Sequence, residues 1–224
     1  MDSKCQSQLK IVLLGGRNSG KNAVGNLILG KEDFVTKERT SCCRRMGVVA
    51  GRWLTVVDTP GWWCDFSVQD TPKEMVFSLS LCPPGPHVFL LVVRVDRAVT
   101  ETFRRAAQEH LELISEHIWN SVILLLSFGD WLGAMTTEHY IESGGQSLLW
   151  LVEKCGNRYH VLNSKTKGDE FQVRELIGKI EELRTSCDVF WHYELEKSVK
   201  EERANERLRR KRCQSQMAKS YLGK

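Results

Sequence analysis

The stretch LKIVLLGGRNSGKNAVGNLILG, residues 9–30, constrains the fold more than any other part of the sequence. Its segment GGRNSGKN matches the phosphate-loop pattern GxxxxGK[ST] at Gly15, Gly20 and Lys21, and departs from it only at Asn22. An apolar segment precedes the loop and an amphipathic one follows it. The pattern requires this strand–loop–helix order, because the loop N–H groups and the helix N-terminus surround a phosphate together. The sequence therefore predicts a phosphate-binding loop.

The glycines and the lysine of this loop have distinct expected roles. Gly15 and Gly20 allow the backbone to wrap around an anion, and the Lys21 ammonium reaches the β- and γ-phosphates of a nucleotide. The residues predicted to contact the nucleotide here are Gly15, Gly16, Arg17, Asn18, Ser19, Gly20, Lys21, Asn22 and Ala23.

Asn22 stands where the pattern has serine or threonine. A hydroxyl oxygen at this position binds Mg²⁺, whereas asparagine offers a neutral amide oxygen on a longer side chain. Because the metal bridges the β- and γ-phosphate oxygens, weaker Mg²⁺ binding should affect a triphosphate more than a diphosphate. The predicted loop thus has a weakened metal site.

A second motif, VVDTPG, ends an apolar segment downstream of the loop. It supplies the DxxG arrangement, in which the Asp58 carboxylate orients a metal-bound water and the Gly61 N–H faces the γ-phosphate. Trp62 follows, where many small GTPases carry a water-orienting glutamine, and an indole cannot orient water as an amide does. Any hydrolysis should be slow or should depend on groups from elsewhere.

A switch residue is expected between the two motifs, in KERTS. Thr40, or Ser41 next to it, would close over Mg²⁺ and the γ-phosphate. The alternative is an ordinary loop rich in threonine and serine. With this assignment, the expected metal ligands are Asn22, Thr40 and Asp58.

Residues that read the base are expected at the ends of two further apolar segments. Guanine-binding proteins usually have an NKxD motif at this point. In SVILLLSFGD its four positions are Ser127-Phe128-Gly129-Asp130, and only the aspartate matches. A carboxylate there would accept hydrogen bonds from the N1 and N2 donors of guanine, which adenine lacks. Asn163, in YHVLNSK, can supply a second contact near the base.

Short apolar segments alternate with longer amphipathic ones along the chain. The segments typical of buried strands are residues 9–15, 53–61, 87–95, 121–130 and 158–163, and those typical of helices are 21–29, 100–119, 141–156 and 169–186. Thr100 is the expected N-cap of the second helix, and Gly30 ends the first. The expected inner faces are at Phe103, Ala107, Leu111, Ile114 and Ile118, at Leu148, Leu149 and Val152, and at Phe171, Val173, Leu176, Ile180 and Leu183. This alternation predicts an α/β fold with a mostly parallel sheet covered on both faces.

The 224 residues suit one globular domain with an appendage. The net charge of +4 is small, but Lys and Arg are concentrated near the end, in EERANERLRRKRC. We expect residues 187–224 to form a charged helix that frays into a solvated end, the alternative being a basic arm for an anionic membrane or an acidic partner. Basic residues at a helix end, without a surrounding recognition fold, do not predict nucleic-acid binding.

The apolar segments and the first residues of the chain predict its cellular compartment. No apolar segment reaches the roughly 18 residues of a membrane span, and MDSKCQSQLK lacks the layout of a secretory signal. We therefore expect a cytoplasmic protein whose eight cysteines are reduced. Their spacing contains no CxxC pair and does not predict a zinc site.

These motifs together make the chain similar to the GTPase IMAP family, the immunity-associated GTPases, over residues 9–184. The most specific parts are LKIVLLGGRNSGKNAVGNLILG, VVDTPGWW, CPPGPH with the strand after it, the motif ending in Asp130, and LVEKCGNRYHVLNSK. The resemblance implies a three-layer P-loop G domain, at residues 8–186, with about six strands, which binds GTP or GDP with Mg²⁺. It also implies a cytosolic protein that associates with itself or with related G domains. The family usually has serine at the position of Asn22.

Some relatives activate hydrolysis with an arginine that is donated across a dimer from the segment after the third buried strand. In this sequence VRVDRAVTE provides Arg97, with Arg94 three residues earlier. An arginine of this kind accelerates hydrolysis by about 10³–10⁵-fold. The alternative is a solvated loop arginine.

Two functional hypotheses follow. The first is a guanine-nucleotide switch with slow hydrolysis assisted by dimerisation. The second is a G domain that stays bound to GDP, or nearly without nucleotide, and serves as a scaffold for active relatives; Asn22 and Trp62 favour it. A third class, an ATPase, does not explain a carboxylate at Asp130, because adenine lacks the N1 and N2 donors that this carboxylate would bind.

Overall fold

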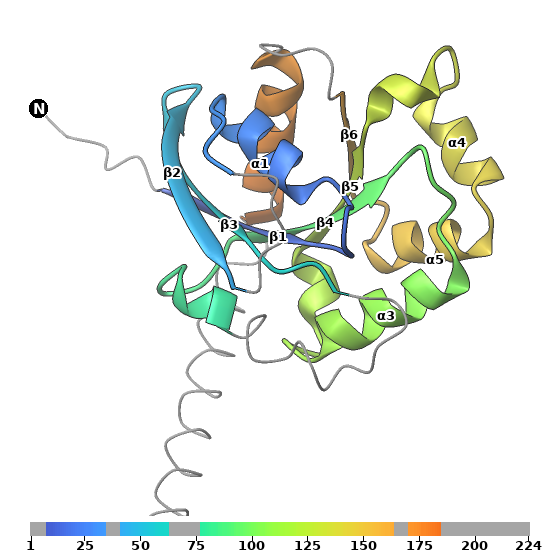
Figure 1. The fold of residues 1–224 in the computed structure, drawn as a ribbon, viewed down its shortest axis with the longest axis horizontal. Coiled ribbons are helices and arrows are strands. Elements are labelled where there is room, and N and C mark those ends of the chain that lie inside the picture. The colour runs from blue at the N-terminus through green and yellow to red at the C-terminus, as the bar shows by residue number, and fades with distance from the viewer. Residues whose placement is uncertain (1–7, 35–40, 63–76, 164–169, 185–224) are drawn as a thin grey trace, which may run out of the picture. The chain divides into compact units, whose positions relative to one another are not determined.

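The computed structural model describes residues 8–34, 41–62, 77–163 and 170–184 (Figure 1). Thr40 and the predicted tail, residues 187–224, lie outside these ranges. Within them, six strands form one sheet in the order β2-β3-β1-β4-β5-β6. Their bounds are β1 Leu9–Leu14, β2 Cys43–Val49, β3 Arg52–Asp58, β4 Val88–Arg94, β5 Val122–Ser127 and β6 Tyr159–Leu162.

Five of the six strands coincide with the predicted apolar segments, and they pair in parallel. Nearly every residue of β1, β4 and β5 is buried, as expected for strands that are covered on both faces. The predicted α/β fold with a mostly parallel, six-stranded sheet is therefore confirmed.

The strand β2 is not apparent from the apolar pattern of the sequence. It pairs antiparallel with β3 at one edge of the sheet, and its residues are mostly exposed or half-buried. A two-residue turn joins the strands, with φ of 50° at Ala50 and 76° at Gly51. Hairpin turns with two positive φ angles favour asparagine or glycine at the first position. Alanine there leaves only a weak turn signal.

The described helices are α1 Lys21–Leu29, α3 Glu101–Glu112, α4 Thr137–Ser143, α5 Gln146–Lys154 and residues 170–184, with the 3₁₀ segments η2 Ile118–Ser121 and η3 Gly129–Leu132. Residues 77–80 are also helical. Two predicted helix ends are confirmed: the Thr100 hydroxyl accepts a hydrogen bond from the Phe103 N–H at 3.2 Å, and Gly30 ends α1 with φ 62°. No helix in the described ranges is both long and apolar enough to span a bilayer.

Two helix predictions need correction. The segment 141–156 is not one helix, because Gly144 and Gly145 separate α4 from α5 and Gly145 has φ 83°. The predicted helix 100–119 already ends at Glu112. Phe171, expected on an inner face, is 70% exposed in the first turn of its helix.

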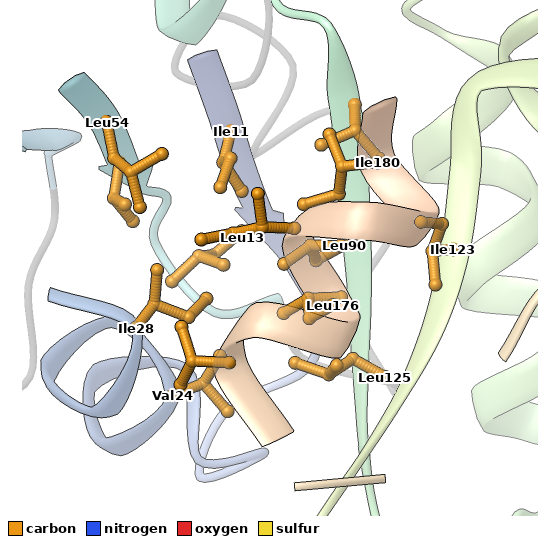
Figure 2. Packing of buried hydrophobic residues seen from close by; sticks show 14 of the residues in the cluster. Ile11, Leu13, Val24, Ile28, Leu54, Leu90, Ile123, Leu125, Leu176 and Ile180 are labelled. Carbon is orange, nitrogen blue, oxygen red and sulfur yellow. The ribbon is translucent and has the colours of Figure 1, made fainter. Parts of the chain in front are cut away.

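Helices cover both faces of the sheet (Figure 1), which completes the predicted three layers. The helix α1 and residues 170–184 lie on one face, and α3 and α5 lie on the other. Figure 2 shows Ile28 of α1 and Leu176 of the last described helix beside Leu13 and Leu90 of the central strands, and all four are at most 1% exposed. Because β1, β3, β4, β5 and β6 are parallel, their carboxyl ends meet at the edge of the sheet where α1 begins.

Candidate functional site

The loop between β1 and α1 has the backbone of an anion-binding loop. Gly15 has φ 153°, and Gly20, the N-cap of α1, has φ 91°. A Cβ at Gly15 would lie 2.7 Å from the carbonyl oxygen of Val92, so this position accepts only glycine. Among the described residues, none caps α1 with its side chain, and the buried Ser19 Oγ has no hydrogen-bond partner. The loop therefore forms a cradle whose donors suit a phosphate.

Lys21 points its ammonium group into this loop. Its Nζ donates to the carbonyl oxygens of Gly15 at 3.0 Å and Gly16 at 3.1 Å, and the residue is 6% exposed. Burial lowers the pKa of Lys21 to about 8, while the charge of the buried Asp58 acts in the opposite direction. A cation held in this way is stabilised by a neighbouring anion. The site therefore has the charge and the donors that a nucleotide phosphate needs.

The pKa of Lys21 predicts that nucleotide binding takes up a proton above about pH 8. A bound phosphate raises this pKa, because it favours the charged ammonium. Affinity should be constant below about pH 8 and should fall by up to about tenfold per pH unit above it, until the pKa of the complex is reached. Calorimetry near pH 9, in buffers of different ionisation enthalpy, should show proton uptake by the unmodified chain and none by Lys21→Met. Equal results for the two proteins would contradict this assignment.

The DxxG segment lies directly against the loop. The Thr59 hydroxyl donates to the Leu13 carbonyl at 2.7 Å and so fixes the end of β3 beside β1. The Arg17 N–H donates to the Trp62 carbonyl at 2.9 Å. A Cβ at Gly61 would lie 2.8 Å from the Arg17 Cα, so this approach requires glycine. The structure thus brings together the two motifs that lie far apart in the sequence.

The indole of Trp62 is a core group rather than a water-orienting one. It is 1% exposed and stacks on His110 of α3, with a centroid distance of 4.9 Å; Phe103 lies 6.3 Å away. Burial lowers the pKa of His110, which favours a neutral ring in this stack. Trp62 therefore packs the DxxG segment against α3, and its buried side chain does not orient water.

The residues expected to read the base lie together at the ends of β5 and β6. The Ser127 hydroxyl donates to the Ser19 carbonyl at 2.9 Å, which fixes the end of β5 to the phosphate loop. Asp130 follows in η3 and is half-buried. A Cβ at Gly129 would lie 2.5 Å from the Asn163 Oδ1, so Asn163 borders the turn that carries Asp130.

Asn163 is held by Gln172, a residue that the motifs do not single out. The Gln172 Oε1 accepts from the Asn163 N–H at 2.8 Å, and the Gln172 Nε2 donates to the Asn163 carbonyl at 3.4 Å. Gln172 is only 7% exposed. A glutamine beside Val173, on the inner side of an amphipathic helix, is the one sequence signal for this role.

The two arginines after the third buried strand differ in their contacts. Arg94 binds the Asp96 carboxylate through two hydrogen bonds of 2.7 and 2.6 Å, and it donates to the Asn18 carbonyl at 3.3 Å. Arg97 is exposed. Arg94 is therefore bonded to the phosphate loop of its own chain. Arg97 is accessible, as an arginine donated to a partner must be.

The other predicted site residues are placed as follows. Asn22 lies in the first turn of α1 and is half-buried, while Ala23 and Ser41 are exposed. Thr40 lies outside the described residues. The metal ligand set of Asn22, Thr40 and Asp58 therefore stays a prediction.

The AIG1 family model matches residues 9–212. The chain belongs to the AIG1 family. It is similar to human GTPase IMAP family member 8, with 31% identity over 81% of this chain and 29% of that protein. It is also similar to Arabidopsis thaliana immune-associated nucleotide-binding protein 7, with 29% identity over 89% of this chain and 68% of that protein. The expected resemblance to GTPase IMAP proteins is confirmed.

Solved structures share the fold at low sequence identity. Toc33 from Arabidopsis thaliana in complex with GDP and Mg²⁺ superposes with a TM-score of 0.65 and 15% identity, over 80% of this chain and 85% of that one. The G domain of the T. maritima FeoB iron transporter gives a TM-score of 0.52 and 20% identity, over 79% and 99%. These likenesses show the fold of a P-loop G domain. The chain spans 29% and 46% of the length of two of its curated relatives.

Proposed function

We propose that this AIG1-family chain binds GTP and GDP, together with Mg²⁺, through the loop at residues 15–23. The buried Lys21 ammonium carries the proposal, because it lies in an anion cradle close enough to Asp58 for their charges to interact. The names of the relatives support it, since they are described as a GTPase and as nucleotide-binding proteins. Toc33, which shares the fold, was crystallised with GDP and Mg²⁺ and with GMPPNP and Mg²⁺.

Residues at the carboxyl ends of the strands have different proposed roles in binding the nucleotide. Lys21 and the loop N–H groups hold the phosphates, and Asp130 and Asn163 contact the guanine edge. Asn22 and Asp58 would hold Mg²⁺, together with the switch threonine. When bound, the metal neutralises charge on the β- and γ-phosphate oxygens.

Hydrolysis is proposed to be slow and to depend on association with a second G domain. The exposed Arg97 could then reach a partner's nucleotide. A solved structure of the same fold supports this idea, because dimerization is important for the GTPase activity of the chloroplast translocon components atToc33 and psToc159. The alternative is a GDP-bound scaffold without appreciable hydrolysis. The packing of Trp62 into α3 and the amide at Asn22 favour this alternative.

We also propose interaction partners and a cellular location for this chain. The chain is proposed to act in the cytoplasm with itself or with related G domains, and not to bind nucleic acid. Its basic tail is proposed to touch anionic membranes peripherally, an electrostatic contact that added salt should weaken.

Replacing Asn22 with serine is expected to restore triphosphate binding. The serine hydroxyl supplies the Mg²⁺ ligand that the amide lacks, so affinity for GMPPNP should rise by about tenfold with Mg²⁺, while affinity for GDP changes little. Titration calorimetry of both nucleotides, with Mg²⁺ and with EDTA, measures this difference.

Asn120→Ser is a matched control, because Asn120 is exposed in η2. It should leave both affinities unchanged. Equal, tight Mg²⁺-dependent binding of GDP and GMPPNP by the unmodified chain would contradict the weakened metal site and would favour the slow GTPase.

A further inference from the structure

The residue that follows β5 has an unusual backbone and an unusual neighbour. Phe128 adopts a left-handed conformation with φ 59°, which is rare for a bulky side chain and is typically retained at functional sites. The Arg94 guanidinium lies over its ring, 4.2 Å from the centroid. The pairing of β4 with β5 brings the two together, because Arg94 is the register partner of Ser127.

The pair is fixed to the phosphate loop from two sides. Arg94 is held by the Asp96 carboxylate and donates to the Asn18 carbonyl. A Cβ at Gly20 would lie 2.9 Å from the Phe128 Cε2, so the edge of the ring touches the end of the loop. The half-buried ring therefore lies beside the phosphate loop, and Asp130 follows two residues further along the chain.

This position matches what a purine needs when its phosphates lie in the loop. Nucleobases stack on aromatic side chains because each has a π-face, and a guanidinium on a ring adds a cation–π contact. The usual NKxD sequence has a lysine where Phe128 stands. In this chain the cation comes instead from β4, and the flat surface comes from β5.

We infer that Phe128 is the stacking surface for the purine ring of the nucleotide and that Arg94 is the residue that positions it. The inference rests on the proposed function, which it deepens by assigning the base contact. Asp130 and Asn163 then read the edge of a base whose plane is set by Phe128. The stack strengthens binding of any purine nucleotide, whereas Asp130 selects guanine.

Stacking can be separated from a purely structural role with a ligand that has no base. Phe128→Leu keeps an apolar side chain but loses the aromatic face. It is expected to weaken GDP binding by about tenfold and to leave pyrophosphate binding unchanged, while Phe128→Tyr retains both affinities. Arg94→Ala should weaken GDP binding severalfold and pyrophosphate binding less, since it also removes the hydrogen bond to the Asn18 carbonyl of the loop.

The chain offers a matched control pair. Arg104 lies over the Trp150 ring at 4.5 Å and binds the Glu101 carboxylate at 2.7 and 2.8 Å, an equivalent arrangement between α3 and α5. Arg104→Ala and Trp150→Leu should change neither affinity.

The outcomes separate the inference from the function on which it rests. If the unmodified chain binds GDP no more tightly than pyrophosphate, no base pocket exists, and both the guanine function and the stack are wrong. If GDP binds more tightly but Phe128→Leu weakens both ligands equally, or neither, Phe128 acts through the loop and the inference alone is overturned.

Discussion

Replacing Lys21 with methionine is expected to lower the affinity for GDP and for GMPPNP by about 100-fold or more. The ammonium supplies charge-assisted hydrogen bonds to the phosphates from a position 6% exposed, where solvent screens it little. Methionine fills a similar volume without the charge. The substitution removes a buried charge but also leaves the buried Asp58 carboxylate without its cationic neighbour, so the unfolding transition of the variant is measured alongside its affinity. Calorimetry on nucleotide-stripped protein measures the affinities.

Lys179→Met is the control for this substitution. Its ammonium also donates to a backbone carbonyl, that of Tyr159 at 3.1 Å, but at the beginning of β6 rather than at the carboxyl ends of the strands. It should leave GDP affinity unchanged. If Lys21→Met kept full affinity with a normal unfolding transition, the loop would have no part in the site.

Asp130→Asn is expected to remove most of the preference for guanine over adenine. The carboxylate would accept from both guanine donors, and loss of two charge-assisted bonds should weaken GDP binding by roughly 10- to 100-fold. ADP, which lacks those donors, should bind as before. Competition titrations with GDP and ADP measure the ratio.

Xanthosine diphosphate gives this substitution a second readout. Xanthine has an oxygen where guanine has its amino group, so the asparagine N–H can donate to it. The variant should therefore bind the xanthine nucleotide more tightly than the unmodified chain does. If selectivity for GDP survived and xanthine binding did not improve, the base would be read by another residue.

Much of the fold and the loop could be predicted because their signals are local. The apolar strands need only their own residues to be recognised, and Thr100 and Gly30 mark helix ends through their own hydrogen bonds and φ angles. Gly15, Gly20 and Lys21 have a fixed spacing that the chemistry of phosphate binding imposes.

What could not be predicted depends on contacts between distant segments. The edge strand β2 has a polar pattern and an Ala50–Gly51 turn of low specificity, so only its pairing with β3 reveals it. In the sequence, Phe128 is only a departure from the NKxD motif. Its contact with Arg94 could not be predicted, because it depends on the register of β4 and β5. Gln172 gains its role only because its helix brings it to Asn163.

The measurement that tests the central claim most directly is titration of GDP, ADP and pyrophosphate into the nucleotide-stripped, unmodified chain with Mg²⁺. A guanine-nucleotide site built from Lys21, Asp130 and the loop predicts that GDP binds at least about 100-fold more tightly than ADP and clearly more tightly than pyrophosphate. Equal affinities for GDP and ADP, or no binding of any of the three, would contradict the account.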